Sequence, residues 1–80
     1  MEREATISPA EFVIAQLGGL TATAKALGRP VTTVQGWKDR GQIPQVYWTQ
    51  LMGIAGDRQI DIEVSDFLNR HPAEAEASAA

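Results

Sequence analysis

Cysteine is absent from this 80-residue chain, and histidine occurs once, at His71. Without cysteine the chain has neither a disulfide framework nor a thiolate metal site, and one histidine offers little for metal binding or acid–base chemistry. No apolar run approaches the roughly 20 residues that a bilayer-spanning helix needs, and no charged-then-apolar leader precedes a cleavage site. We therefore expect a cytoplasmic protein with no metal, no cofactor and no membrane contact.

The arrangements that most enzymes need are also missing from the sequence. It has no glycine-rich phosphate loop, no nucleophile–base pair and no paired carboxylates in an apolar setting, so we expect no enzymatic activity. Four carboxylates do lie close together in the sequence, namely Asp57, Asp61, Glu63 and Asp66. Their spacing does not match the calcium-loop pattern, and we interpret them as a solvated acidic surface in preference to a cation site.

The net charge of −3 is distributed unevenly along the chain. Residues 1–20 carry −2, residues 52–80 carry −4, and residues 21–51 carry +3. The charged residues of this central segment are Lys25, Arg29, Lys38, Arg40 and Asp39. A local basic face matters more for contact with phosphates than the overall charge does. The central segment is therefore a candidate for binding nucleic acid, and the acidic flanks should weaken non-specific binding.

With 80 residues, of which 44% are hydrophobic, the chain has room for one small domain with a single core. The apolar residues recur at helical spacing. Ser8 followed by Pro9 and Glu11 is typical of a helix start, since serine caps the helix, proline fits its first position and glutamate completes a capping box. This helix should run to about Leu17, where a glycine pair ends it, with Phe12 facing the core.

The middle of the chain predicts two further short helices joined by a tight turn. The first covers about residues 22–27 behind a capping Thr21, and the second covers about residues 31–39. Gly28 can end the first helix in a left-handed conformation, because glycine has no Cβ to clash. The fixed φ of Pro30 suits the start of the second helix.

In each of these helices two apolar residues three positions apart share one face. Ala24 and Leu27 form such a pair in the first helix, and Val34 and Trp37 in the second. A small residue at Ala24 allows the two helix axes to approach closely. This pattern is what a helix-turn-helix needs, and its second helix is the one that lies in a DNA major groove.

The same segment resembles a known family of regulators. Thr21-Ala-Thr-Ala-Lys-Ala-Leu-Gly28 resembles the start of the helix-turn-helix of the lambda Cro family and related small phage-type repressors. Trp37-x3-Gly41-x-Ile43-Pro44 is similar to Cro-like regulators that carry W-x3-G-x-I-P. The resemblance covers about residues 17–55. It implies sequence-specific binding to a short operator, usually to repress transcription.

A fourth helix should follow Pro44, because proline suits the first position of a helix. It covers about residues 45–54, with Leu51 on its apolar stripe. Gly53 and Gly56 should weaken this helix and then end it, because glycine has a low helix propensity.

The expected fold is all-α, a small bundle of four to five short helices that contains a helix-turn-helix of the lambda repressor/Cro-like type. Alternation over residues 59–64 suggests an extended piece, whereas residues 65–68 fit one more helical turn. Periodicity over so few residues does not decide between helix and strand. We assign the folded domain to residues 8–70 and expect disordered ends at 1–7 and 71–80, the latter rich in alanine and glutamate.

The candidate base-reading residues lie on the outer face of the helix at 31–39 and are Val31, Thr32, Gln35 and Gly36. Gln35 can make two hydrogen bonds to an adenine edge, and a valine or threonine methyl can contact the thymine methyl. The first three match reading positions of the family that the segment resembles. Thr32 suits a base or a phosphate, and Gln35 is alternatively a polar residue on a solvated face. Gly36 replaces the longer polar residue often found there, which allows close approach but removes one reader.

The candidate phosphate contacts are Gln16, Thr21, Thr23, Thr33, Lys38, Arg40 and Gln42. Thr21 and Thr23 flank a helix N-terminus, whose free N–H groups and dipole favour an anion. Lys38 and Arg40 follow the reading residues, where the DNA backbone should run. Pro30 stands where related proteins more often carry a capping serine or threonine, so no hydroxyl is expected there.

The competing hypothesis is a protein-interaction module, such as an antitoxin that holds a toxin or a regulator that docks on the transcription machinery. Trp48 and the apolar residues of 60–68 would supply its surface. The same residues are candidates for pairing two copies, as a homodimer or side by side on double-stranded DNA, because one helix contacts few base pairs. They can also close the core of the monomer. Only DNA binding predicts an affinity that collapses with salt.

Overall fold

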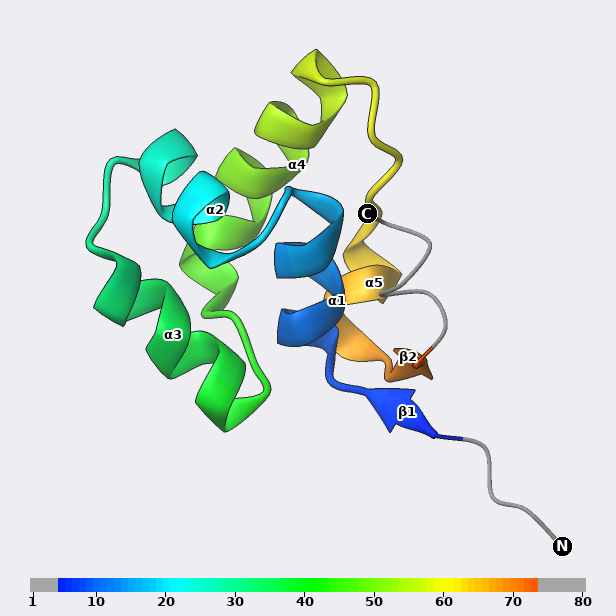
Figure 1. Ribbon diagram of the computed structural model, residues 1–80. Helices are drawn as coiled ribbons and strands as arrows, with labels where there is room; N and C mark the ends of the chain where they lie inside the picture. The colour runs from blue at the N-terminus through cyan, green and yellow to red at the C-terminus, as the bar shows by residue number, and fades with distance from the viewer. Residues whose placement is uncertain (1–4, 74–80) are drawn as a thin grey trace, which may run out of the picture.

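The computed structural model describes residues 5–73, and these are mostly helical. The elements in chain order are β1 (Thr6–Ile7), α1 (Pro9–Gln16), α2 (Leu20–Leu27), α3 (Val31–Arg40), the 3₁₀ helix η1 (Gln45–Tyr47), α4 (Trp48–Asp57), α5 (Val64–Leu68) and β2 (His71–Pro72). Helix α1 lies in the middle, with α2 and α3 on one side and α5 and the strand pair on the other (Figure 1). The expected bundle of short helices is confirmed at this level, and the strand pair was not expected.

Helix α1 starts and ends as its sequence predicts. The Ser8 hydroxyl accepts a hydrogen bond from the Glu11 backbone N–H at 3.1 Å, and Pro9 occupies the first helical position. Gly18 and Gly19 follow with φ of 100° and 108°, which residues with a Cβ rarely adopt. The chain therefore leaves α1 sharply and enters α2 at once.

Helix α2 begins two residues before the expected start, so the prediction that Thr21 caps it was wrong. Gly19 is the N-cap, and its carbonyl accepts the Thr23 backbone N–H at 3.0 Å. The half-buried Leu20 packs against the core from the first helical position instead of preceding the helix. At the other end Gly28 has a φ of 68° and ends α2 in the left-handed conformation, as predicted.

Helix α3 begins after Pro30 and ends at Gly41, whose φ is 81°. A Cβ atom at Gly41 would lie 3.3 Å from the Cβ of Ser8, so the end of α3 fits closely against the residue that caps α1. Glycine serves two purposes at this position, because it permits the left-handed turn and the close approach.

The fourth predicted helix differs from the observed one at both ends. Residues 45–47 form the 3₁₀ turn η1, and α4 continues to Asp57. Gly53 and Gly56 both lie within α4 and do not end it. Each costs about 1 kcal/mol of helix propensity relative to alanine, but tertiary packing supplies most of the stability of a short helix. The buried side chain of Leu51 provides such packing here.

Of the two interpretations of residues 59–70, the helical one is confirmed at its C-terminal part. Val64–Leu68 form α5, and the Glu63 backbone N–H donates to the Asp66 carboxylate at 2.8 Å. Residues 60–63 belong to no strand. Ile62 is buried although it lies in the irregular connection between α4 and α5. Its burial explains the alternation of apolar and polar residues in this segment.

The folded domain extends beyond the predicted range 8–70 at both ends. Ile7 and His71 pair in the antiparallel ladder of β1 and β2, and the His71 ring stacks on Phe12 with the centroids 3.6 Å apart. Residues 5–7 and 71–73 are therefore part of the fold, contrary to the predicted disorder. These contacts join distant parts of the chain, so no local pattern revealed them. The rest of the predicted ends, residues 1–4 and 74–80, lies outside the described residues.

The core contains the residues that the sequence placed there. Trp37 is buried at its centre and contacts the Tyr47 ring, with the ring centroids 4.7 Å apart. Phe12, which was expected to face the core, packs against it while half-buried. The buried apolar cluster comprises Ala10, Val13, Ile14, Leu17, Ala24, Leu27, Val34, Trp37, Ile43, Leu51, Ala55, Ile62 and Phe67.

Replacing Trp37 by alanine should remove the centre of this core. We expect Trp37→Ala to lower the free energy of unfolding by about 3–5 kcal/mol, which is most of the stability of a domain of this size. Val46→Ala is the matched control, because Val46 is 81% exposed and should change stability by less than about 0.5 kcal/mol. Thermal and urea unfolding followed by circular dichroism measure both variants. Cooperative melting of Trp37→Ala at the wild-type temperature would contradict this packing scheme.

Candidate nucleic-acid interface

The packing of α2 on α3 decides which face of α3 reaches solvent. Ala24 of α2 and Val34 and Trp37 of α3 are all buried, so this side of α3 is turned inward. Helix α3 itself lies at the edge of the molecule, away from α5 and the strand pair (Figure 1). Its other face is free of the core, and the exposed or half-buried residues there are Val31, Thr32, Gln35, Gly36, Asp39 and Arg40.

All four candidate base-reading residues fall on this outer face. Val31 and Thr32 are exposed, whereas Gln35 and Gly36 are half-buried. Helical spacing arranges the face as two rows, because residues four apart lie above one another. Val31 and Gln35 begin one row, and Thr32 and Gly36 begin the other.

Asp39 is the third residue of the row that begins with Val31 and Gln35, and it accepts a hydrogen bond from Gln35. The Gln35 side-chain Nε2 donates to the Asp39 Oδ1 at 2.8 Å. Asp39 was not among the candidate site residues, although a glutamine and an aspartate four apart on a helix are expected to form such a bond. The amide of Gln35 is therefore directed along α3, and one of its two N–H donors is engaged by Asp39.

The prediction that Thr23 contacts a phosphate was wrong. Its side chain is fully buried, and its hydroxyl donates to the Gly19 carbonyl oxygen at 2.8 Å. The start of α2 at Leu20 moves Thr23 one turn into the helix and onto the inner face. Thr21, in contrast, is exposed in the first turn of α2, where unpaired backbone N–H groups lie.

The other candidate phosphate contacts stay accessible to different extents. Arg40 and Gln42 are exposed, at the end of α3 and just beyond it. Gln16, Thr33 and Lys38 are half-buried. These side chains come from α1, α3 and the connection after α3.

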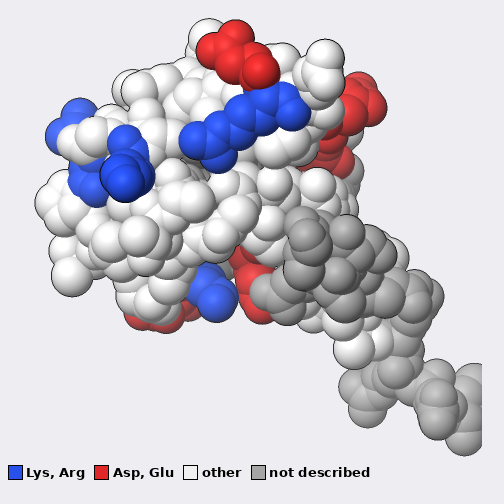
Figure 2. Space-filling view, turned by 45° about the horizontal axis from the view of Figure 1, so that its top comes forward, with Lys and Arg blue, Asp and Glu red and all other residues white. Residues whose placement is uncertain are grey.

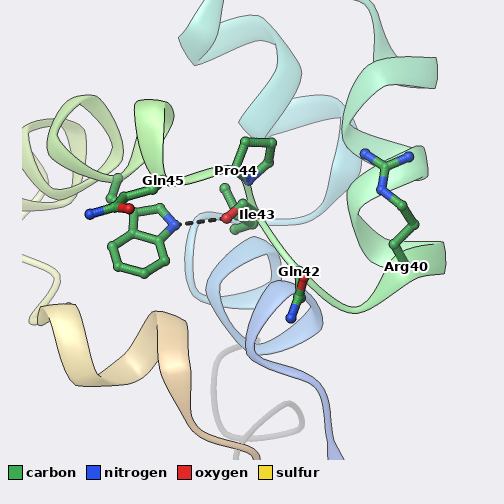
Figure 3. A pocket seen from close by; sticks show the side chains of 6 residues that line it. Arg40, Gln42, Ile43, Pro44 and Gln45 are labelled. Atoms are coloured by element: carbon green, nitrogen blue, oxygen red, sulfur yellow. Dashed lines mark hydrogen bonds between the residues drawn. The ribbon is translucent and has the colours of Figure 1, made fainter.

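A pocket of about 280 Å³ lies beside the C-terminal end of α3 (Figure 3). The Trp48 indole N–H donates to the Ile43 carbonyl at 2.8 Å and fixes the loop that forms its wall. Side chains of Gln42 and Gln45 stand around the opening, so the pocket has polar hydrogen-bonding groups next to α3. The lining residues are Arg40, Gln42, Ile43, Pro44, Gln45 and Trp48.

The four basic residues of the central segment, Lys25, Arg29, Lys38 and Arg40, lie on α2, on α3 and in the connection between them. In the view of Figure 2, Lys and Arg side chains gather at the upper left, whereas those at the top and at the bottom of the view lie next to Asp or Glu side chains. Arg29, in the connection between α2 and α3, has its guanidinium carbon 5.7 Å from the centroid of the Tyr47 ring. Arg29 belongs to the basic segment of residues 21–51 but was not predicted as a site residue. Its ring partner is 18 positions away, so local spacing gave no signal for the contact.

The apolar surface expected for a partner is smaller than predicted. Ile62 and Phe67 are buried, and Trp48 is half-buried with its ring stacked on Phe67 at 5.0 Å. These residues close the core of the monomer, as the alternative interpretation had it. Only Val64 and Leu68, which are 48% and 63% exposed, leave an apolar face open on α5.

Metal-binding clusters and membrane-spanning helices are both absent from the described part of the chain. Between residues 5 and 73, no three histidine or carboxylate side chains come together as a metal site requires. No helix in this range has the length and hydrophobicity needed to cross a membrane.

Comparison of the chain with protein-family models, with curated proteins and with solved structures finds no match. The residues and the geometry of the α2–α3 region are therefore the basis on which a function can be assigned.

The buried position of Thr23 leads to a test that separates folding from binding. Thr23→Val keeps the shape and removes the hydroxyl, so we expect a loss of about 1 kcal/mol in stability and no change in DNA affinity. Thr21→Ala, at the exposed neighbouring position, should leave stability within about 0.5 kcal/mol. Urea unfolding and a salt titration of DNA binding measure the two variants. Full stability of Thr23→Val together with weaker DNA binding would show that this hydroxyl is not a structural one.

Proposed function

We propose that this protein binds double-stranded DNA at a specific sequence, with α2 and α3 acting as a helix-turn-helix and α3 entering the major groove. The observation that carries the proposal is the outer face of α3. It presents hydrogen-bonding and methyl-bearing side chains in two rows, while the opposite face is anchored in the core through Val34 and Trp37. The major groove, about 12 Å wide, admits one α-helix.

The reading chemistry is assigned to Val31, Thr32 and Gln35. A bidentate contact between glutamine and adenine is worth about 1–3 kcal/mol of discrimination. The exposed bond between Gln35 and Asp39 stabilises the helix by only about 0.2–0.5 kcal/mol, so an adenine edge can displace Asp39. Val31, which is 42% exposed at the first position of α3, offers a methyl surface to thymine.

Phosphate contacts are assigned to the start of α2 and to the end of α3. Thr21 lies in the first turn of α2, where the helix dipole and the free N–H groups favour an anion. Lys38 and the pocket rimmed by Gln42 and Gln45 lie at the C-terminal end of α3. Anchors on both helices would fix the register of α3 in the groove without reading sequence.

The resemblance of residues 17–55 to Cro-like regulators supports the same function. It also favours repression of transcription as the role of the protein. The local charge also fits, because residues 21–51 carry +3 in a chain of net charge −3. We expect binding that weakens steeply with salt, since each phosphate neutralised adds about −0.9 to the slope of log affinity against log salt.

Two substitutions on α3 should have different effects on binding. Gln35→Ala should lose about 1–3 kcal/mol on the preferred site and relax the preference at one base pair. Lys38→Ala should weaken binding to all duplexes alike and make the salt slope shallower by about one. Selection from random duplexes, followed by gel shifts at defined salt, measures both. If both variants keep the wild-type affinity on the selected site, α3 is not the reading helix.

We also propose that two copies act together on DNA. A single short helix contacts few base pairs, and linking a second copy raises affinity without new base readers. The exposed apolar pair on α5, Val64 and Leu68, is the face assigned to the contact between copies. A foreign protein, such as a toxin, is the other occupant proposed for this face.

Light scattering on free and operator-bound protein tests the pairing. We expect a complex of two copies per duplex on an inverted repeat with half-sites about one helical turn apart, and a tandem array would give direct repeats. Leu68→Lys should abolish the second copy but leave the fold intact, because Leu68 is largely exposed. One monomer bound to one duplex at nanomolar affinity would contradict the proposal.

A further inference from the structure

The strongest unassigned feature of the outer face of α3 is the contact between Gly36 and Arg40. A Cβ atom at Gly36 would lie 3.3 Å from Nη1 of Arg40 and 3.9 Å from both Cζ and Nη2. The guanidinium therefore lies directly over the bare backbone of Gly36. The Arg40 side chain runs back along α3 toward the preceding turn, and it stands apart from Gln42 and Gln45 (Figure 3).

Helix geometry explains this position. Side chains on an α-helix lean toward its N-terminus, so a residue covers the surface over the preceding turn. Arg40 follows Gly36 by four positions and shares the row that begins at Thr32. Because Gly36 contributes no side chain, the guanidinium occupies the space that a longer residue would fill.

Packing of the core does not explain the glycine. Gly36 lies within a regular α-helix, where glycine costs about 1 kcal/mol relative to alanine. Apart from the helix backbone, the three nearest atoms that a Cβ would meet all belong to the Arg40 guanidinium. Glycine at position 36 therefore leaves space that the Arg40 guanidinium occupies.

The guanidinium is also not taken up by an acidic partner. Asp39, its neighbour in sequence, is engaged with Gln35 at 2.8 Å. Within the residues that the structure describes, Arg40 forms no ion pair. The planar donor fork is therefore exposed next to Gln35, on the face of α3 assigned to the bases.

We infer that Arg40 reads a guanine in the major groove from the position of Gly36, and is not a phosphate contact. This inference rests on the proposed function. Arginine donates two parallel hydrogen bonds to O6 and N7 of guanine, which is the commonest specific contact in the major groove. Arg40 thus supplies the base reader that glycine at position 36 lacks.

Binding to a selected duplex and to the same duplex with 7-deazaguanine tests the inference, because the analogue lacks the N7 acceptor. Wild-type protein should lose about 5- to 100-fold in affinity on the modified duplex, whereas Arg40→Ala should bind the two duplexes equally. Arg40→Lys keeps the charge but not the planar fork, so it should also lose discrimination at this guanine.

Gly36→Ala moves the guanidinium without removing its charge. It should be at least as stable as wild type and yet lose discrimination at the same base pair, and it should have no further effect in an Arg40→Ala background. Gly53→Ala is the matched control, because Gly53 lies within α4 and a Cβ there would meet nothing within 4 Å. This control should gain stability without any change in DNA binding.

Three results would overturn the inference. A selected site without a fixed guanine would do so, and so would an Arg40→Ala variant that weakens all duplexes equally and stays sensitive to the analogue. The latter result identifies a phosphate contact and leaves the proposed function standing. Wild-type protein that selects no sequence at all overturns the proposed function together with the inference.

Discussion

The close contact between α2 and α3 is the constraint on which the rest of the molecule depends. Ala24 is small enough for the two helices to approach closely. Val34 and Trp37, on the inner face of α3, are buried in the core. Trp37 also contacts Tyr47, so η1 and α4 are positioned by the same side chain. Because one face of α3 is held in this way, the direction of every side chain on its other face is determined.

The two sides of the bundle serve different purposes. On one side, β1 pairs with β2 and His71 stacks on Phe12, which ties the two ends of the described chain together. On the other side, α3 has its outer face in solvent and is held only through its inner face and its end at Gly41. The contacts that stabilise the fold are therefore separate from the residues proposed to bind DNA, and substitutions in one group need not disturb the other.

Within the outer face of α3, side chains organise one another before any ligand arrives. Asp39 orients the amide of Gln35, and Gly36 leaves space for the guanidinium of Arg40. Both contacts are exposed and weak, so they direct the side chains without preventing an exchange of partners. Such partial preorganisation lowers the entropic cost of ordering these side chains on binding.

The sequence by itself determined the features that depend on neighbouring residues. Ser8 and Pro9 define the start of α1, Gly28 and Gly41 end α2 and α3, and the three-residue spacing of Val34 and Trp37 gives the inner face of α3. Capping, left-handed glycines and helical periodicity are local, so they can be predicted from the chain alone.

The tertiary structure decided the features that depend on contacts between distant residues. The burial of Thr23, the continuation of α4 past Gly53, the pairing of residues 6–7 with 71–72 and the closure of the core by Phe67 all involve packing that no local pattern specifies. The position of Arg40 over Gly36 belongs to this group in part. The four-residue spacing permits it, but the direction of a long, flexible side chain depends on the space and the partners around it, and those are fixed only when the helices pack together.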